Sequence, residues 1–214
     1  MDEGSATSTP RRGRPRDPAI EEAVMRATTN RLAADGYTRM TIADVAEDAG
    51  VTRPTIYRRW PGKRELVTAA LDFRFRQEQA TRPPLDLDGM SAIEAVKAAL
   101  RRLIPAREAD RVVPLIGSVL VEDLHTPELI QIFREHAMAP RVQIFADTLR
   151  ALQKRGDLKL ALDIDMISTL CFGTYLADHL RHGKADTDLA DRVVDTLWPA
   201  LAECPPGRNC TRGS

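Results

Sequence analysis

Basic side chains gather in two short stretches of this 214-residue chain that contain no acidic residue. One runs from Arg11 to Arg16, and the other runs from Arg53 to Arg64. Such groups suit the phosphates of a nucleic acid, and an arginine can also bind the O6/N7 edge of guanine with two hydrogen bonds. The whole chain balances 31 Lys and Arg against 31 Asp and Glu, so any attraction of a polyanion must be local.

The second basic stretch follows a pattern that predicts two short helices joined by a tight turn. Thr41 and Thr52 occupy N-cap positions, so we expect helices at about 42–48 and 53–59. Gly50 lies between them and can adopt the positive φ that a tight connection requires. The pattern therefore predicts a helix-turn-helix unit.

The outward face of the second helix has the chemistry of DNA recognition. If Ile56 points inward, Arg53, Pro54, Tyr57 and Arg58 share the opposite face. An arginine at the start of the helix can read guanine, the proline ring can meet a thymine methyl group, and the tyrosine hydroxyl can donate to a phosphate. We interpret this face as the DNA-reading surface.

Residues 18–71 resemble the DNA-binding domain of the tetracycline-repressor-like (TetR) transcription regulators. The segments that carry the resemblance are Thr41-Ile42-Ala43-Asp44-Val45-Ala46, Ala49-Gly50-Val51 and Thr55-Ile56-Tyr57-Arg58-Arg59-Trp60-Pro61-Gly62-Lys63-Arg64-Glu65-Leu66. The resemblance implies that the helix starting at Arg53 is the recognition helix and that Tyr57 and Lys63 contact phosphates. Trp60 and Pro61 depart from the family, which more often has Phe and a polar residue there. The candidate DNA contacts are Arg14, Thr41, Thr52, Arg53, Pro54, Thr55, Tyr57, Arg58, Arg59 and Lys63.

The first basic stretch has two interpretations. Arg12-Gly13-Arg14-Pro15-Arg16 resembles the Arg-Gly-Arg-Pro core of AT-hook segments, which place arginines in an A·T-rich minor groove. The same composition is typical of a disordered, solubilising tail. Both interpretations stay open for Arg14.

The rest of the chain predicts an all-α fold. Apolar residues recur at helical spacing, and no segment alternates apolar and polar residues convincingly enough to predict a strand. We divide the chain into a basic arm (1–17), a helix-turn-helix domain (18–71), an effector-binding and dimerisation domain (72–203) and a tail (204–214). The role of the third part is implied by the resemblance.

A helix expected between Asp163 and Gly183 has apolar residues all round its axis, which predicts burial on every side. We expect it to pack on its own domain and on a second copy of the chain, together with a final helix at about 188–202. The resulting homodimer predicts a pseudo-palindromic DNA operator. The candidate dimer contacts are Ile167, Leu170, Cys171, Thr174, Asp178, Val194, Leu197, Trp198 and Leu201.

The resemblance also implies that the middle helices of the third part enclose a cavity for a small apolar or amphipathic effector. Kinks at Pro114 and Pro140 would open space between helices. Apolar residues at helical spacing are more often core than cavity wall, so the assignment of individual residues stays open. The candidate effector contacts are Leu115, Val119, Phe145, Leu149 and Tyr175.

Other classes of function find little support in the sequence. His179 and His182 lack further ligands at zinc-like spacing, and we find no catalytic constellation, cofactor loop or metal site. No segment is apolar enough to span a membrane, and the arginine-rich N-terminus is unlike an export signal, so we expect a cytoplasmic protein. A helical small-ligand carrier or enzyme that keeps the helix-turn-helix only as a packing unit is the alternative.

Overall fold

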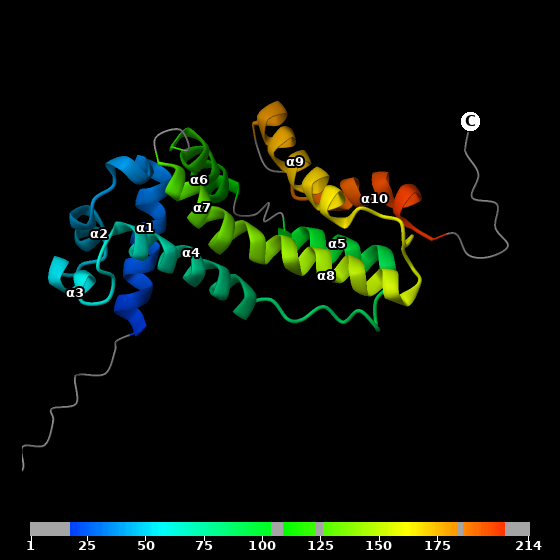
Figure 1. The fold of residues 1–214 in the computed structure, drawn as a ribbon, viewed down its shortest axis with the longest axis horizontal. Helices are drawn as coiled ribbons and strands as arrows, with labels where there is room; N and C mark the ends of the chain where they lie inside the picture. The colour runs from blue at the N-terminus through cyan, green and yellow to red at the C-terminus, as the bar shows by residue number, and fades with distance from the viewer. Residues whose placement is uncertain (1–17, 104–108, 123–125, 184–185, 204–214) are drawn as a thin grey trace, which may run out of the picture.

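The computed structural model describes residues 18–103, 109–122, 126–183 and 186–203. These residues form helices with no strand among them, which confirms the predicted all-α fold (Figure 1). An isolated antiparallel bridge joins Leu158 and Ala202. The elements are α1 (Pro18–Arg39), α2 (Ile42–Asp48), α3 (Arg53–Tyr57), α4 (Lys63–Ala80), α5 (Ala92–Leu103), α6 (Ala109–Glu122), α7 (Pro127–Phe133), the π-helical turn η2 (Arg134–Met138), α8 (Ala139–Arg155), α9 (Ile164–His182) and α10 (Leu189–Leu201).

Helices α1 to α4 meet at one end of the molecule, on the left in Figure 1. Val24 of α1, Val45 of α2, Ile56 of α3 and Leu66 of α4 are completely buried there and belong to one apolar cluster. Each short helix thus contributes at least one side chain to a shared core. Because α2 and α3 are too short to be stable alone, this burial is what holds them in place.

Helix α1 is kinked at Gly36, where φ is 78° and ψ is 167°. Just after the kink, Thr38 donates two hydrogen bonds to the carboxylate of Glu122 on α6, from its backbone N–H (2.9 Å) and its hydroxyl (2.5 Å). Just before it, the Ser118 hydroxyl of α6 donates to the carbonyl oxygen of Leu32 (3.0 Å). The kink therefore joins α1 to α6.

Helix α4 is shared between the two ends of the molecule. Leu66 and Ala70 pack with α1, α2 and α3, whereas Val67 and Leu71 pack in a second cluster with residues of α6 and α7. The helix runs unbroken from Lys63 to Ala80, so the boundary that we expected between residues 71 and 72 falls inside it.

A third cluster joins α5, α8, α9 and α10, and Leu100, Phe145, Leu149 and Val194 are buried in it. The break expected at Pro140 occurs as the π-helical turn η2, directly before α8 begins. Proline lacks an N–H and its ring clashes with the carbonyl group four residues earlier, which accounts for the widened turn.

Within its own chain helix α9 is buried on one face, and the burial of its other face by a second copy stays a prediction. Ile167 and Cys171 face the core of their own chain, and so do Val194 and Leu201 of α10. Burial also raises the pKa of the Cys171 thiol to about 11. These four candidate dimer contacts are therefore core residues. Of the others, Leu170 and Thr174 are exposed, whereas Asp178, Leu197 and Trp198 are half-buried.

The substitution Gly36→Ala is expected to destabilise the fold. A non-glycine residue at this φ and ψ costs roughly 1–3 kcal/mol, and a Cβ atom would lie 2.8 Å from the Glu122 Oε1 atom. Thermal unfolding should show a Tm several degrees lower than that of the wild type.

Gly117→Ala on α6 is the matched control, because a Cβ atom there meets nothing within 4 Å. It should leave the Tm unchanged or raise it, since alanine favours a helix. Equal effects of the two substitutions would show that the kink imposes no constraint.

Candidate nucleic-acid interface

Helix α2 begins with a complete capping box. The Thr41 hydroxyl accepts a hydrogen bond from the backbone N–H of Asp44 (3.2 Å), and the Asp44 carboxylate accepts one from the backbone N–H of Thr41 (3.1 Å). The Thr41 hydroxyl also donates to this carboxylate, and these bonds hold the pKa of Asp44 below its ordinary value. Thr41 is confirmed as an N-cap, and the bonds orient the start of α2.

The turn between α2 and α3 is as tight as the sequence predicted. Gly50 has φ of 64°, and the backbone N–H of Val51 donates to the carbonyl oxygen of Ala46 (2.9 Å). Ala46 is buried, so the small side chain allows close packing there. The geometry is that of a helix-turn-helix.

Helix α3 presents the expected outward face. Ile56 is fully buried, while Arg53, Pro54, Tyr57 and Arg58 are exposed, with half of the Tyr57 surface open to solvent. In the part of the chain that the structure describes, Arg53 makes no hydrogen bond or ion pair. The guanidinium at the start of α3 is thus available to a partner.

A chain of polar contacts links the remaining side chains of α3. Thr52 is the N-cap residue by its extended backbone, but its hydroxyl makes no capping bond and instead lies 3.0 Å from the Thr55 hydroxyl. Arg58 donates to the same Thr55 oxygen (3.2 Å). Arg58 is therefore folded back along the helix surface, which sets it apart from Arg53.

One candidate DNA contact, Arg59, points away from the outward face of α3. The Arg59 Nη1 atom lies 3.8 Å from a Glu21 carboxylate oxygen, and its guanidinium lies 5.9 Å from the centre of the Trp60 ring. This arginine packs between α3 and α1. Arg14 lies outside the described residues.

Lys63 has its ammonium group against the end of α1. Its Nζ atom donates to the carbonyl oxygens of Tyr37 (2.7 Å), Thr38 (3.3 Å) and Met40 (3.2 Å), and it lies 4.7 Å from the centre of the Tyr37 ring. An ammonium group has three N–H donors, so these carbonyls engage all of them. The ammonium group therefore ties the start of α4 to the end of α1, and the phosphate contact that the resemblance implied stays a prediction.

Arg31, which was not among the residues predicted from the sequence, fixes α2 against α1. Its guanidinium binds both carboxylate oxygens of Asp48 (2.6 and 2.8 Å) and also contacts Asp35. The hydrogen bonds that Arg31 donates to Asp48, and then to Asp35, raise the pKa of Arg31. An arginine on a helix with an acidic residue four positions later is a weak signal, and the partner 17 positions away cannot be read from spacing.

A small cavity of about 40 Å³ lies between α4, α6, η2, α8 and α9. Two of the candidate effector contacts, Leu115 and Tyr175, line it. Val119, Phe145 and Leu149 are buried in the clusters beside it and do not line it. The cavity is therefore lined by two of the five candidate residues.

The described residues contain no group of three or more His, Cys, Asp or Glu side chains that could hold a metal ion. None of their helices is long and apolar enough to cross a membrane.

Comparison with known families finds two matches that together span most of the chain. Residues 24–70 match the model of the bacterial regulatory proteins of the tetR family. Residues 88–197 match the model of the tetracyclin repressor-like C-terminal domain. The first match contains the helix-turn-helix, and the second contains α5 to α9 and most of α10.

Similar proteins are transcriptional regulators. The chain is 30% identical to an HTH-type transcriptional regulator of Mycobacterium bovis over 88% of this chain and 93% of that protein. It is 28% identical to the DNA-binding transcriptional repressor TetR of Mycobacteroides abscessus over 79% of this chain and 87% of that protein.

Solved structures share the fold. A TetR-family regulator from Rhodococcus sp. has a TM-score of 0.67 and 20% identity, over 85% of this chain and 97% of that chain. A transcriptional regulator from Saccharomonospora viridis in complex with choline has a TM-score of 0.62 and 19% identity, over 88% of this chain and 100% of that chain.

The substitution Lys63→Met is expected to lower the Tm, because it removes a charged donor from three carbonyl groups at the end of α1. Hydrogen bonds to a charged group each contribute roughly 1.5–3 kcal/mol. Thermal unfolding measures the loss, and Lys154→Met on the exposed face of α8 is the control. If both variants unfold at the wild-type temperature, the ammonium group does not hold this junction.

Proposed function

Because the chain belongs to the tetR family of bacterial regulatory proteins, and is thus a DNA-binding transcriptional regulator and not an enzyme, we propose that it acts as a homodimeric repressor. Two α3 helices, one from each copy, would bind the two halves of a pseudo-palindromic operator. A small apolar or amphipathic effector in the cavity would release the DNA. Such a regulator would work in the cytoplasm, where bacterial DNA lies.

The proposed reading of DNA depends mainly on the outward face of α3. Arg53 is exposed and unpaired among the described residues, and Pro54 and Tyr57 lie beside it on the same face. The buried Ile56 and the Gly50 turn fix this face relative to α2. A short helix held this way can enter the major groove with its first residues on the base edges.

The contacts between α1 and α6 support release by an effector. Leu115 and Ile116 of α6 line the cavity, and Glu122 near the end of the same helix binds Thr38. Partial burial opposes ionisation of Glu122, but the hydrogen bonds from Thr38 outweigh it and hold the pKa of this carboxyl below its ordinary value. A ligand that displaces α6 would therefore displace α1 as well. It would favour a conformation in which the two α3 helices no longer fit the operator.

What similar proteins do supports the same proposal. One relative is a repressor, and one regulator of the same fold binds the small molecule choline. We infer that this chain is a repressor with a small-molecule effector, because it belongs to this family and contains a cavity. The competing interpretation, a carrier that keeps the helix-turn-helix as a packing unit, gains no support from these relatives.

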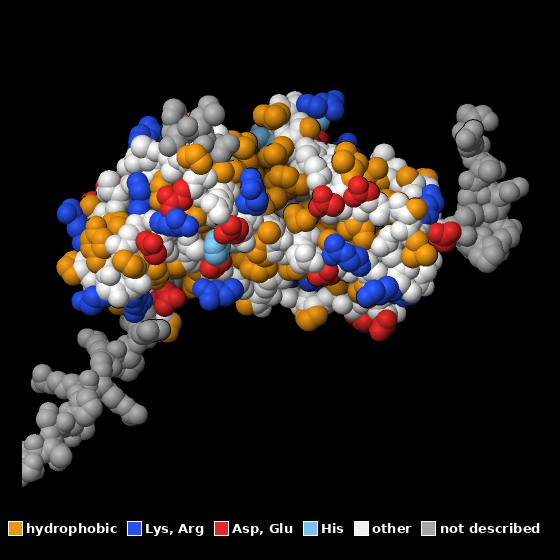
Figure 2. All heavy atoms as spheres, in the orientation of Figure 1, with side chains coloured by type: hydrophobic (Ala, Val, Ile, Leu, Met, Phe, Trp, Pro, Cys, Tyr) orange, Lys and Arg blue, Asp and Glu red, His pale blue; other side chains and the backbone are white. Residues whose placement is uncertain are grey.

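An apolar stripe on α9 supports the proposed dimer. Five residues, spaced alternately by four and three positions, are exposed along one face of this helix, and they are Met166, Leu170, Gly173, Ala177 and Leu180. Such a stripe is the seam along which two helices pack, and glycine and alanine allow a close approach. Figure 2 shows hydrophobic side chains gathered at and beside α9, on the upper side of the molecule. We propose that this face, rather than the buried Ile167 and Cys171, meets the second copy.

Arg53→Ala is expected to relax the base preference of the protein at one position in each half of the operator. A bidentate arginine contact contributes roughly 1–3 kcal/mol of discrimination. Selection of bound sequences from random DNA measures the base preference of the wild type and that of the variant. Arg76→Ala, which removes an exposed arginine from α4, is the control. The role of Arg53 is wrong if both variants select the wild-type sequence with undiminished preference.

Leu170→Glu is expected to convert the dimer into monomers, because a carboxylate would be buried in an apolar seam. Analytical ultracentrifugation measures the mass of the wild type and the variant. Leu160→Glu, at an exposed position outside α9, is the control and should stay dimeric. A wild-type monomer, or a dimer that tolerates Leu170→Glu, would contradict the proposed interface.

A further inference from the structure

The cavity is apolar on most sides but carries charge at one end. Its apolar wall consists of Leu71, Leu103, Val112, Leu115, Ile116, Phe133, Ala137, Met138 and Phe172, and Tyr175 adds a phenol ring. The three charged side chains that line it are Arg74 and Glu78 of α4 and Arg141 of α8. A ligand that fills this space must therefore have an apolar body and a polar end.

The three charged residues form one buried cluster around the Glu78 carboxylate, which is only 8% exposed. The Arg74 Nε atom donates to Glu78 Oε1 (3.1 Å). The Arg141 Nε and Nη2 atoms both donate to Glu78 Oε2 (3.1 and 2.7 Å). One carboxylate is thus shared by two guanidinium groups, and both of its oxygens are occupied.

Arg141 retains donors that the cluster does not use. Besides its two bonds to Glu78, it donates from Nη1 to the carbonyl oxygen of Ala137, and its guanidinium lies 5.2 Å from the centre of the Phe75 ring. A guanidinium has five N–H donors, so two remain without an acceptor among the described residues. These donors can bind a second anion.

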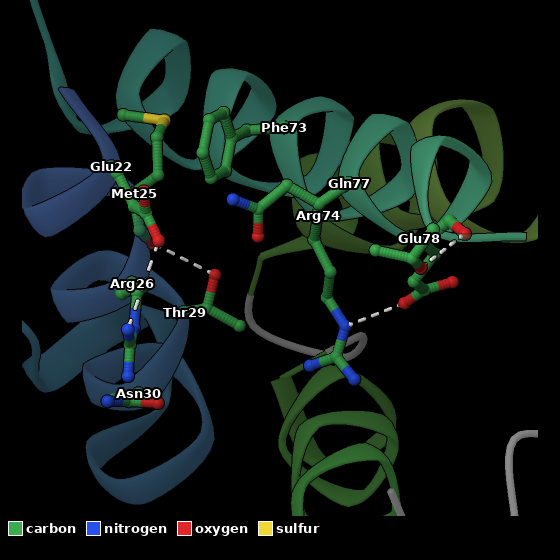
Figure 3. Close-up of a pocket in the computed structure, with 10 residues that line it drawn as sticks. Glu22, Met25, Arg26, Thr29, Asn30, Phe73, Arg74, Gln77 and Glu78 are labelled. Atoms are coloured by element: carbon green, nitrogen blue, oxygen red, sulfur yellow. Dashed lines mark hydrogen bonds and ion pairs between the residues drawn. The ribbon is translucent and has the colours of Figure 1, made fainter. Parts of the chain in front are cut away.

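The cluster stands between the cavity and an open groove. Arg74 and Glu78 line both the cavity and a groove between α1 and α4, which also contains Met25, Thr29 and Gln77. Figure 3 shows this groove and the bond from Arg74 to Glu78 on its α4 side. A charged group at the cluster would lie at the boundary between the apolar space and water.

We propose that the effector is an amphipathic anion, whose carboxylate binds Arg141 while its apolar body enters the small cavity and enlarges it. Planar guanidinium donors match a carboxylate in geometry and charge. A cationic ligand would meet two guanidinium groups and a carboxylate whose oxygens are already bound, which disfavours it. This inference rests on the proposed function, because it names the chemical class of the effector.

The position of Glu78 gives such an anion a way to act on DNA binding. Glu78 belongs to α4, which begins shortly after the helix-turn-helix. Arg141 belongs to α8, which packs with α5, α9 and α10 at the other end of the molecule. A ligand carboxylate on the remaining N–H donors of Arg141 would compete with Glu78 for the positive charge of the same guanidinium. Binding would therefore weaken a buried contact between α4 and α8.

The first test compares three probes of equal chain length on the full-length protein: octanoate, 1-octanol and octylamine. Isothermal titration calorimetry at neutral pH should give an affinity for octanoate at least about tenfold higher than for the alcohol or the amine, since a charge-assisted hydrogen bond is worth this much. Octylamine or 1-octanol binding as tightly as octanoate would overturn the proposal. No heat from octanoate at millimolar concentration would overturn it too.

Glu78→Gln provides the sharper test, because it removes the competing carboxylate and keeps the side-chain shape. Octanoate should bind this variant several-fold more tightly than the wild type. A cationic ligand that depends on the Glu78 carboxylate would instead bind the variant more weakly than the wild type. Arg141→Gln should abolish the preference for octanoate over 1-octanol. Arg150→Gln, on the exposed side of α8, is the control and should leave all affinities unchanged. Circular dichroism confirms that each variant is folded.

A DNA-binding assay separates this inference from the proposed function. Octanoate should also release the selected operator from the wild type and fail to do so with Arg141→Gln. If the protein binds a specific operator but octanoate neither binds nor releases it, the ligand class is wrong and the regulator stands. If no specific operator is found while octanoate binds through Arg141, the repressor proposal is wrong and the anion site stands.

Discussion

The kink at Gly36 is the constraint that fixes the position of the helix-turn-helix relative to the rest of the molecule. The backbone turns out of the helix there, so carbonyl and N–H groups near the end of α1 need partners from outside it. Lys63 at the start of α4 binds three of these carbonyls, and Glu122 at the end of α6 accepts from Thr38. Three helices from distant parts of the chain thereby meet at one point. Because the backbone conformation is one that only glycine adopts easily, this junction is specified by a single residue.

The helix-turn-helix could be predicted from sequence because its determinants are local. Thr41 caps α2, Gly50 makes the turn and Ile56 anchors α3, and each of these residues acts on neighbours only a few positions away. The long-range contacts could not be predicted in the same way. The spacing of apolar residues does not distinguish the inward Cys171 from the outward Leu170, because α9 carries apolar side chains of its own all round its axis.

The arginines show why composition alone is a poor guide to a DNA-binding surface. Arg53, Arg58 and Arg59 lie within seven positions, yet one is unpaired among the described residues, one folds back onto Thr55 and one packs beside Trp60. Their surroundings, and not their type, decide which can reach a base. The net charge of the chain is balanced partly because acidic residues such as Asp48 pair with arginines that hold helices together.

Helix α4 gives these separate features a common mechanical basis. Its first turn holds the end of α1 through Lys63, its middle is buried in both neighbouring clusters, and its last turns carry Glu78 into the wall of the cavity. A continuous helix transmits displacement along its axis because its backbone hydrogen bonds resist bending. A change in the partners of Glu78 would therefore reach the helix-turn-helix without passing through a flexible linker. The buried charge cluster, which costs desolvation energy that an apolar core would not, is consistent with a role in switching rather than in stability.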